Sequence, residues 1–321
     1  MSVKMDKVKS ILKRVPSVTW FILILIVVFS IIDKRYFSAR NFLTLLQQGS
    51  VLLVVASAAT FVLISGGLDL SLGAILTVSG VTAAMAINAG LPIIIAALLA
   101  ALTGFFCGAI NGFFISICGM QPFIVTLGTQ YIFYGFALVI TNEKGISVGN
   151  ESFLFLGSMV HNFIPMAAIC CAFLFILAII IQDRTKLGRY MFAIGGNCEG
   201  ARLSGVNTKF WKWFIYAFAG LMTGLASVVL VARLQVADPL VGSQWEFDAI
   251  AAAILGGTCF DIGKGDVKGT IVGVALLTVV RSGLNVIRIP SMWQSAIIGT
   301  IIILSVVFQV MISTRERLVH E

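Results

Sequence analysis

Charged residues and histidines are scarce in this chain, and their scarcity excludes several classes of protein. Only 11% of its 321 residues are charged and 59% are hydrophobic, whereas soluble domains carry about 25% charged residues. Too little polar surface remains to face water, so a soluble fold is excluded. Two histidines, and six cysteines without a C-x-x-C pair, argue against a zinc or redox site. The cysteines are interpreted as small, buried and reduced residues.

Catalytic and nucleotide-binding motifs are also missing. The sequence contains no G-x-x-x-x-G-K-[ST] loop and no set of nucleophile, base and acid. The net charge of +8 would suggest a nucleic-acid partner in a soluble protein, but here it is interpreted as a topology signal. We therefore predict no enzymatic activity, no cofactor bound by this chain and no nucleic-acid partner. If ATP drives its activity, another chain must bind the ATP.

Long apolar runs dominate what is present. The run IIIAALLAAL at 93–102 is apolar on every side, unlike the alternating strands of membrane barrels. Crossing a bilayer takes about 20 such residues, so we predict an all-α polytopic membrane protein, a single transmembrane domain over 1–321, with some helices broken by glycine. Residues 36–46 are expected to form a short interfacial amphipathic helix. The ten predicted spans are roughly 15–32, 48–65, 70–89, 92–117, 122–140, 163–182, 213–232, 247–260, 268–287 and 293–312.

The distribution of lysine and arginine predicts the orientation. The basic N-terminus resembles a signal peptide, but Asp33-Lys34-Arg35 follows the first span without a cleavage site, which favours an uncleaved helix. With the N-terminus inside, fifteen of the 22 basic residues are inside, six are outside and Arg281 is within a span. This bias places the tails 1–14 and 313–321 in the cytoplasm. It also places 141–162 outside and 183–212 inside.

The segment SGGLDLSLG at 65–73 separates two spans. Gly66 and Gly67 can end a helix, and Asp69 or Ser71 can cap the next one. Alternatively, a glycine-broken helix pair with an acid at membrane depth marks a translocation path. Both interpretations stay open.

A second glycine pair, Gly256-Gly257, ends a later apolar run. Its alignment with residues 64–67 suggests a degenerate internal repeat, which is common in transporters. Asp248, at the start of that run, can cap a half-helix. Other polar residues near the spans could bind a polyol or link helices: Asn111, Gln121, Thr126, Gln130 and Asn285.

The inside segment 183–212 is too long for a plain connector. Asn197 can cap a short helix that begins near Glu199, and Gly205 can end it. This helix is either a solvated connector or a docking helix for a cytoplasmic partner. In the second case Glu199 and Arg202 give it charge, and the small residues Gly200 and Ala201 permit close approach.

A set of motifs in a fixed order carries a resemblance to a known family. They are SGGLDLSLG at 65–73, QPFIVTLG at 121–128, LGRY at 187–190, AIGGN at 193–197, ARLSG at 201–205, FDAIAA at 247–252, LGGT at 255–258 and GLN at 283–285. Together they resemble the permease subunits of bacterial ATP-binding-cassette sugar importers of the ribose, galactoside and xylose type. The resemblance covers nearly the whole chain.

The resemblance implies a multi-pass protein of the bacterial inner membrane that imports a monosaccharide. Its implied partners are a cytoplasmic ATPase that binds ATP and Mg²⁺, a second permease subunit, identical or paralogous, and an extracytoplasmic sugar-binding protein. Glu199-Gly200-Ala201, with Arg202 and Gly205, stands where importers carry the EAA coupling motif, although Gly200 replaces the usual alanine. Phe123, in the second motif, joins the candidate pathway residues. The segment CFDIGK at 259–264 also departs from the small, glycine-rich family pattern.

Two alternatives remain for function. The same machinery could import a nucleoside, a furanosyl signal molecule or a branched-chain amino acid. An ion-coupled secondary transporter would need an intramembrane acid, for which Asp69 and Asp248 are the candidates.

Overall fold

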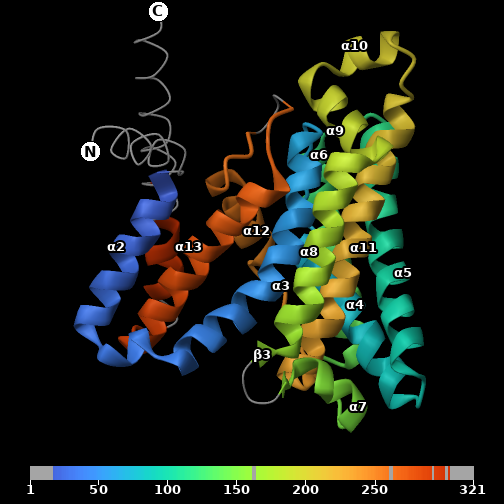
Figure 1. Ribbon diagram of the computed structural model, residues 1–321. Helices are drawn as coiled ribbons and strands as arrows, with labels where there is room; N and C mark the ends of the chain where they lie inside the picture. Colours follow the sequence, from blue (N-terminus) through green and yellow to red (C-terminus); the bar gives the residue numbers. More distant parts are fainter. Residues whose placement is uncertain (1–16, 161–163, 260–262, 291–292, 301–302, 304–321) are drawn as a thin grey trace, which may run out of the picture. The chain divides into compact units, whose positions relative to one another are not determined.

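The computed structural model describes residues 17–160, 164–259, 263–290, 293–300 and 303, and these residues are mostly helical (Figure 1). Two-residue strands form two small antiparallel pairs, β1 with β4 and β2 with β3. In chain order the elements are α2 (Ser17–Ile32), η1 (Lys34–Phe37), α3 (Ala39–Ile64), α4 (Leu72–Asn88), α5 (Ile93–Gly112), η2 (Phe113–Ile117), α6 (Pro122–Thr141), β1 (Ile146–Ser147), α7 (Glu151–Leu154), η3 (Phe155–Gly157), β2 (Met159–Val160), β3 (Ile164–Pro165), α8 (Met166–Arg184), α9 (Lys186–Gly196), α10 (Cys198–Leu203), α11 (Thr208–Leu234), β4 (Val236–Ala237), α12 (Trp245–Leu255) and α13 (Val267–Val286).

Six of the described helices are long and apolar enough to cross a membrane: α3, α5 with η2, α6, α8, α11 and α13. The apolar helices α2 and α4 are shorter. The prediction of an all-α polytopic membrane protein is therefore confirmed. The ten-span count stays a prediction, because the tenth span, 293–312, lies largely outside the described residues. The eighth coincides with α12, whose 11 residues rise only about 16 Å, at about 1.5 Å each, against about 30 Å of hydrocarbon.

The separate interfacial helix expected at 36–46 is wrong. Residues from Ala39 onward form the first turns of α3, which runs unbroken for 26 residues. The break comes earlier, where the Asp33 side chain caps the 3-10 turn η1. The Ser38 hydroxyl then accepts a hydrogen bond from the Asn41 amide at 3.2 Å, as an N-cap does. Because of these local caps, α3 begins at Ala39, several residues before the start predicted for this span.

Contacts divide the chain into two compact units, 46–274 and the combination of 1–45 with 275–321. In the second, α2 packs on the C-terminal half of α13, where Gly283 leaves room for the ring of Phe29. The Tyr36 hydroxyl donates to the Val279 carbonyl at 3.1 Å. The Ser282 hydroxyl donates to the Asn41 side chain at 2.9 Å. These contacts explain why a chain end and a late helix form one unit.

The core of the unit 46–274 is built on α11, which packs against α5 and α4. Glycines let the α5 and α11 backbones touch. A Cβ at Gly104 would overlap the carbonyl oxygen of Gly220, and a Cβ at Gly108 would overlap that of Tyr216. Small residues at such spacing are how membrane helices reach close packing. This close contact between the α5 and α11 backbones, called the glycine seam below, holds the two helices rigidly together.

The segment 183–212, expected as a long loop, is mostly helical. It forms α9 and α10, and single residues, Thr185 and Asn197, separate α8 from α9 and α9 from α10. Figure 1 shows α10 at one end of the α8–α11 pair and α7 at the opposite end. α7 and α10, which belong to segments predicted on opposite sides of the membrane, thus lie at opposite ends of this unit.

Candidate functional site

A buried carboxylate lies in the break between α3 and α4. Gly66 ends α3 with φ of +73°, a conformation that favours glycine. Asp69 is 2% exposed, and its Oδ1 accepts hydrogen bonds from the Ser71 amide at 2.9 Å and the Ser71 hydroxyl at 2.6 Å. Its Oδ2 has no hydrogen-bonding partner among the described residues. Ser71 occupies the N-cap position of α4, but it makes no side-chain capping hydrogen bond. The expected side-chain cap is therefore not formed, and Asp69 instead orders the turn that precedes the helix.

Asp69 begins a chain of hydrogen bonds that joins three helices. The Asn111 side-chain amide, on α5, donates to the Ser71 hydroxyl at 2.7 Å. The Thr129 hydroxyl, on α6, donates to the Asn111 side-chain oxygen at 2.7 Å. All four side chains are buried. The structure therefore brings together the predicted residues Asp69, Ser71 and Asn111. Sequence reasoning missed Thr129, because a threonine in a helix ordinarily bonds its own backbone.

A second buried carboxylate, Glu246, was not predicted either. Its Oε1 accepts a hydrogen bond from the Gln130 side chain at 2.7 Å, and its Oε2 has no partner among the described residues. Gly73 lies directly beside it, because a Cβ there would overlap the Glu246 carboxylate and lie 3.0 Å from the Tyr134 hydroxyl. Asp248, predicted to cap this helix, is not the N-cap, because Gln244 occupies that position. Asp248 is instead buried in the first turn of α12, where the helix dipole favours negative charge. The only signal for Glu246 was an acid within an apolar helix.

The candidates on α6 separate into buried and exposed residues. Thr126 is buried, and its hydroxyl donates to the Pro122 carbonyl at 2.8 Å. Gln121 and Phe123, at the first turn of the helix, are exposed. Gln130, further along the helix, is half-buried.

The second glycine pair ends α12, as the first ends α3. Gly257 has φ of +93°, and Gly256 packs on the Gly269 backbone at the start of α13. Gly67, in the first pair, lies against the Tyr216 ring. Both pairs thus terminate a helix where a second segment approaches closely.

Asn285 is exposed near the end of α13, and its side-chain oxygen accepts from Gln294 at 2.9 Å. It belongs to the unit of 1–45 with 275–321. The other candidates belong to the unit 46–274.

The local structure predicted for the inside segment is confirmed. The Asn197 side chain accepts a hydrogen bond from the Gly200 amide at 2.8 Å and caps α10. Gly205, with φ of +83°, ends it, and the Val206 amide donates to the Ala201 carbonyl at 3.1 Å. This is the glycine-terminated ending expected of a short helix.

The exposed face of α10 differs from the one expected. Ala201 is 7% exposed and faces its own chain, whereas Leu203 is 76% exposed. Glu199 and Arg202 are exposed and form an ion pair. The hydrogen bond from Arg202 lowers the pKa of the Glu199 carboxyl below its ordinary value.

The described residues contain no group of three or more His, Cys, Asp or Glu side chains arranged to hold a metal ion. The two buried carboxylates instead contact amides and hydroxyls. These hydrogen bonds connect the break between α3 and α4 to the neighbouring helices α5 and α6, and the start of α12 to α6.

The sequence similarity to known proteins covers nearly the whole chain. Residues 41–306 match the family described as the permease component of the branched-chain amino acid transport system. The ribose import permease protein RbsC of Bacillus subtilis (strain 168) is 36% identical over 88% of this chain and 88% of its own length. The D-allose transport system permease protein AlsC of Escherichia coli (strain K12) is 36% identical over 92% of this chain and 91% of its own. The galactose/methyl galactoside import permease protein MglC of the same strain is 32% identical over 94% of both chains.

No solved structure matches the chain. The family match covers most of the sequence, and the relatives exceed 30% identity over almost their full lengths. The glycine-ended helices and the capped helix α10 lie within the matched residues. This protein belongs to the family of permease components of the branched-chain amino acid transport system type.

Proposed function

We propose that this chain is the permease subunit of an ATP-binding-cassette importer and forms the membrane passage for a monosaccharide. The observation that carries the proposal is its end-to-end similarity to permeases named for ribose, D-allose and galactose. The buried polar clusters and broken helices are consistent with a passage. The chain itself supplies no bond-breaking chemistry, and ATP and Mg²⁺ bind to the partner ATPase.

The proposed topology is ten spans in the bacterial inner membrane with both termini in the cytoplasm. Contacts within the unit 46–274 support the sidedness. The outside segments meet one another, since Ile146 pairs with Ala237. The predicted outer end of the span 70–89 also meets them, since the Asn88 side chain donates to the Ser147 carbonyl at 2.9 Å. The predicted inner end of the span 163–182 meets an inside segment, since the Gln182 side chain donates to Asp266 at 2.9 Å.

The partner ATPase docks on α10 in this proposal. The surface available to it consists of the exposed Glu199–Arg202 pair and Leu203. Gly200 and Gly205 keep the helix short and permit close approach, and Ala201 holds α10 against its own chain. Nucleotide-driven closure of the ATPases would then displace α10.

Two permease subunits, identical or paralogous, enclose the passage, and an extracytoplasmic binding protein delivers the sugar to its outer mouth. Among the candidate residues, the buried ones, such as Asp69 and Asn111, stabilise the helix breaks. The exposed residues Gln121 and Phe123 are available to the sugar or to the second permease. Selectivity resides mainly in the binding protein.

The test is uptake into proteoliposomes. The chain is reconstituted with its partner ATPase and binding protein, and uptake of labelled ribose, allose and galactose is measured with and without ATP. Leucine and a nucleoside serve as the alternative cargoes. ATP-dependent uptake of one of the three sugars supports the proposal, whereas ATP-dependent uptake of leucine or the nucleoside alone would overturn the sugar assignment.

Ion-coupled transport is the second candidate, because Asp69 is a buried acid with an oxygen that lacks a partner among the described residues. It predicts uptake by the chain alone, driven by a proton or sodium gradient and abolished by an ionophore. Uptake that needs ATP and is insensitive to ionophores would exclude it.

A further inference from the structure

The C-terminal end of α9 touches both helix breaks. A Cβ at Gly195 would overlap the carbonyl oxygen of Ile64, the last residue of α3. The same Cβ would lie 3.0 Å from Gly263 Cα, in the loop between α12 and α13. Gly263 has φ of +59°, and a Cβ there would be 2.8 Å from the Gly195 carbonyl carbon. One glycine thus contacts the ends of two helix pairs that the sequence relates as a repeat.

The backbone of the neighbouring glycine, Gly196, also approaches Gly263, but its Cα faces open space. A Cβ at Gly196 would meet nothing within 4 Å. Both glycines lie in the last turn of α9. A side chain is therefore excluded at Gly195 but not at Gly196.

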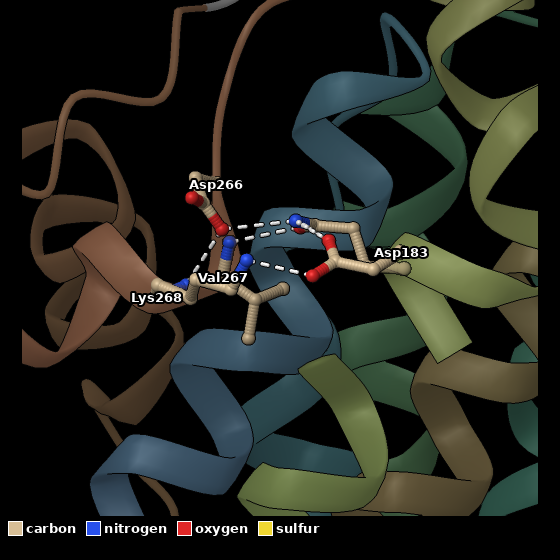
Figure 2. Close-up of polar contacts among 5 residues, drawn as sticks. Asp183, Asp266, Val267 and Lys268 are labelled. Carbon is tan, nitrogen blue, oxygen red and sulfur yellow. Dashed lines mark hydrogen bonds and ion pairs between the residues drawn. The ribbon is translucent and has the colours of Figure 1, made fainter. Parts of the chain in front are cut away.

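The end of α8, which precedes α9, is hydrogen-bonded to the start of α13. Gln182, at the end of α8, is 6% exposed. Its Nε2 donates to Asp266 at 2.9 Å, and its Oε1 accepts from the Val267 amide at 2.9 Å. Figure 2 shows these bonds beside the ion pair between Asp183 and Lys268, at 2.6 Å. A buried glutamine side chain therefore caps the start of α13.

Single-residue connections link α8 and α9, which make these contacts, to α10. Only Thr185 separates α8 from α9, and α9 packs back on α8, because a Cβ at Gly188 would overlap the Gln182 carbonyl oxygen. Only Asn197 separates α9 from α10, and its side chain caps α10. A displacement of α10 must therefore move α9 or break these contacts.

We propose that Gly195 and Gln182 are positioning residues that couple α10 to both helix breaks. The inference rests on the proposed function, in which the ATPase displaces α10. Gly195 packs against the end of α3 and the α12–α13 loop, while Gln182 is hydrogen-bonded to the start of α13. Movement of α10 then shifts both broken helix pairs together, which opens or closes the passage. The coupling element is a set of contiguous contacts rather than a sequence correlation.

The test compares Gly195→Ala with Gly196→Ala in the reconstituted importer. The measured quantity is ATP hydrolysed per sugar imported, beside co-purification of the ATPase. We expect Gly195→Ala to retain the ATPase but to raise the ratio about tenfold, within the range of coupling between sites. Gly196→Ala should behave as the unmodified protein. Equal ratios for the two variants would overturn the proposal.

A second pair of variants decides the matter if Gly195→Ala does not accumulate in the membrane. Gln182→Met removes the bonds to Asp266 and Val267, whereas Lys268→Met removes only a partly exposed ion pair, which contributes little. We expect Gln182→Met to raise the ratio and Lys268→Met to leave it unchanged. A normal ratio in Gln182→Met would refute the role of this residue.

A measurement that needs no sugar separates this inference from the proposed function. Cys259 pairs with Lys264 across the loop that holds Gly263, so its alkylation reports on that loop. In a chain whose other five cysteines are alanine, trapping the ATPase with nucleotide and vanadate should change the alkylation rate of Cys259. The change should persist in Gly196→Ala and vanish in Gly195→Ala. If no tested sugar is imported yet this pattern appears, the sugar assignment fails and the coupling inference stands. The same change in both variants would overturn the inference.

Discussion

The glycine seam between α5 and α11 makes a quantitative prediction. A Cβ at Gly104 would overlap the Gly220 carbonyl oxygen and lie 3.1 Å from Gly224 Cα. Every obstructing atom belongs to the backbone, so no side chain can rotate aside and the helices must separate. Gly128, in the middle of α6, is the matched control, because a Cβ there would meet nothing within 4 Å.

The magnitude follows from the difference between the two sites. Replacement by alanine favours either helix by about 1 kcal/mol, and this gain cancels in the comparison. Overpacking costs about 1–3 kcal/mol, so Gly104→Ala should be less stable than Gly128→Ala by that amount. At about 2 °C per kcal/mol for a chain of this size, the expected difference in Tm is about 2–6 °C. Leucine at the same positions should widen the gap.

The assay is thermal unfolding of the purified chain in mild detergent, followed with a thiol-reactive dye. Cys107, one turn from Gly104 on α5, is buried and becomes reactive when the seam opens. Equal Tm values for Gly104→Leu and Gly128→Leu would show that the α5–α11 contact does not depend on backbone proximity, and the reasoning would fail.

Three further predictions concern orientation and the site. Single cysteines introduced into 141–162 should react with an impermeant reagent in intact cells, whereas those in 195–207 should react only after the membrane is opened; the reverse pattern would invert the topology. Asp69→Asn should keep expression and most uptake, because an amide oxygen can accept the same hydrogen bonds, whereas Asp69→Leu should reduce the amount of folded protein; loss of uptake by a well-folded Asp69→Asn would assign Asp69 to the passage. Leu203→Asp should weaken co-purification of the ATPase without affecting insertion, since Leu203 is exposed, and unaltered binding would mean that α10 is only a connector.

The sequence by itself determined the fold class, most helix positions and the ends of α10. Apolar runs near the length of a bilayer imply membrane helices, because backbone groups in hydrocarbon must be satisfied within the segment. Asn197 and Gly205 predicted the ends of α10, because capping and positive φ depend on a few neighbouring residues. Local chemistry misled at residues 36–46, where the Ser38 hydroxyl accepts a hydrogen bond from the Asn41 amide and α3 begins at Ala39, so that no separate interfacial helix forms.

Only the tertiary structure decided which residues meet. Glu246 lies 116 positions from its partner Gln130, and Gln182 lies 84 positions from Asp266. Gly195 and Gly196 are indistinguishable in sequence, yet only a Cβ at Gly195 would collide with Ile64. The physical reason is that hydropathy and caps are properties of short segments. Hydrogen bonds and backbone contacts between distant helices instead depend on how those helices pack, which no local pattern encodes.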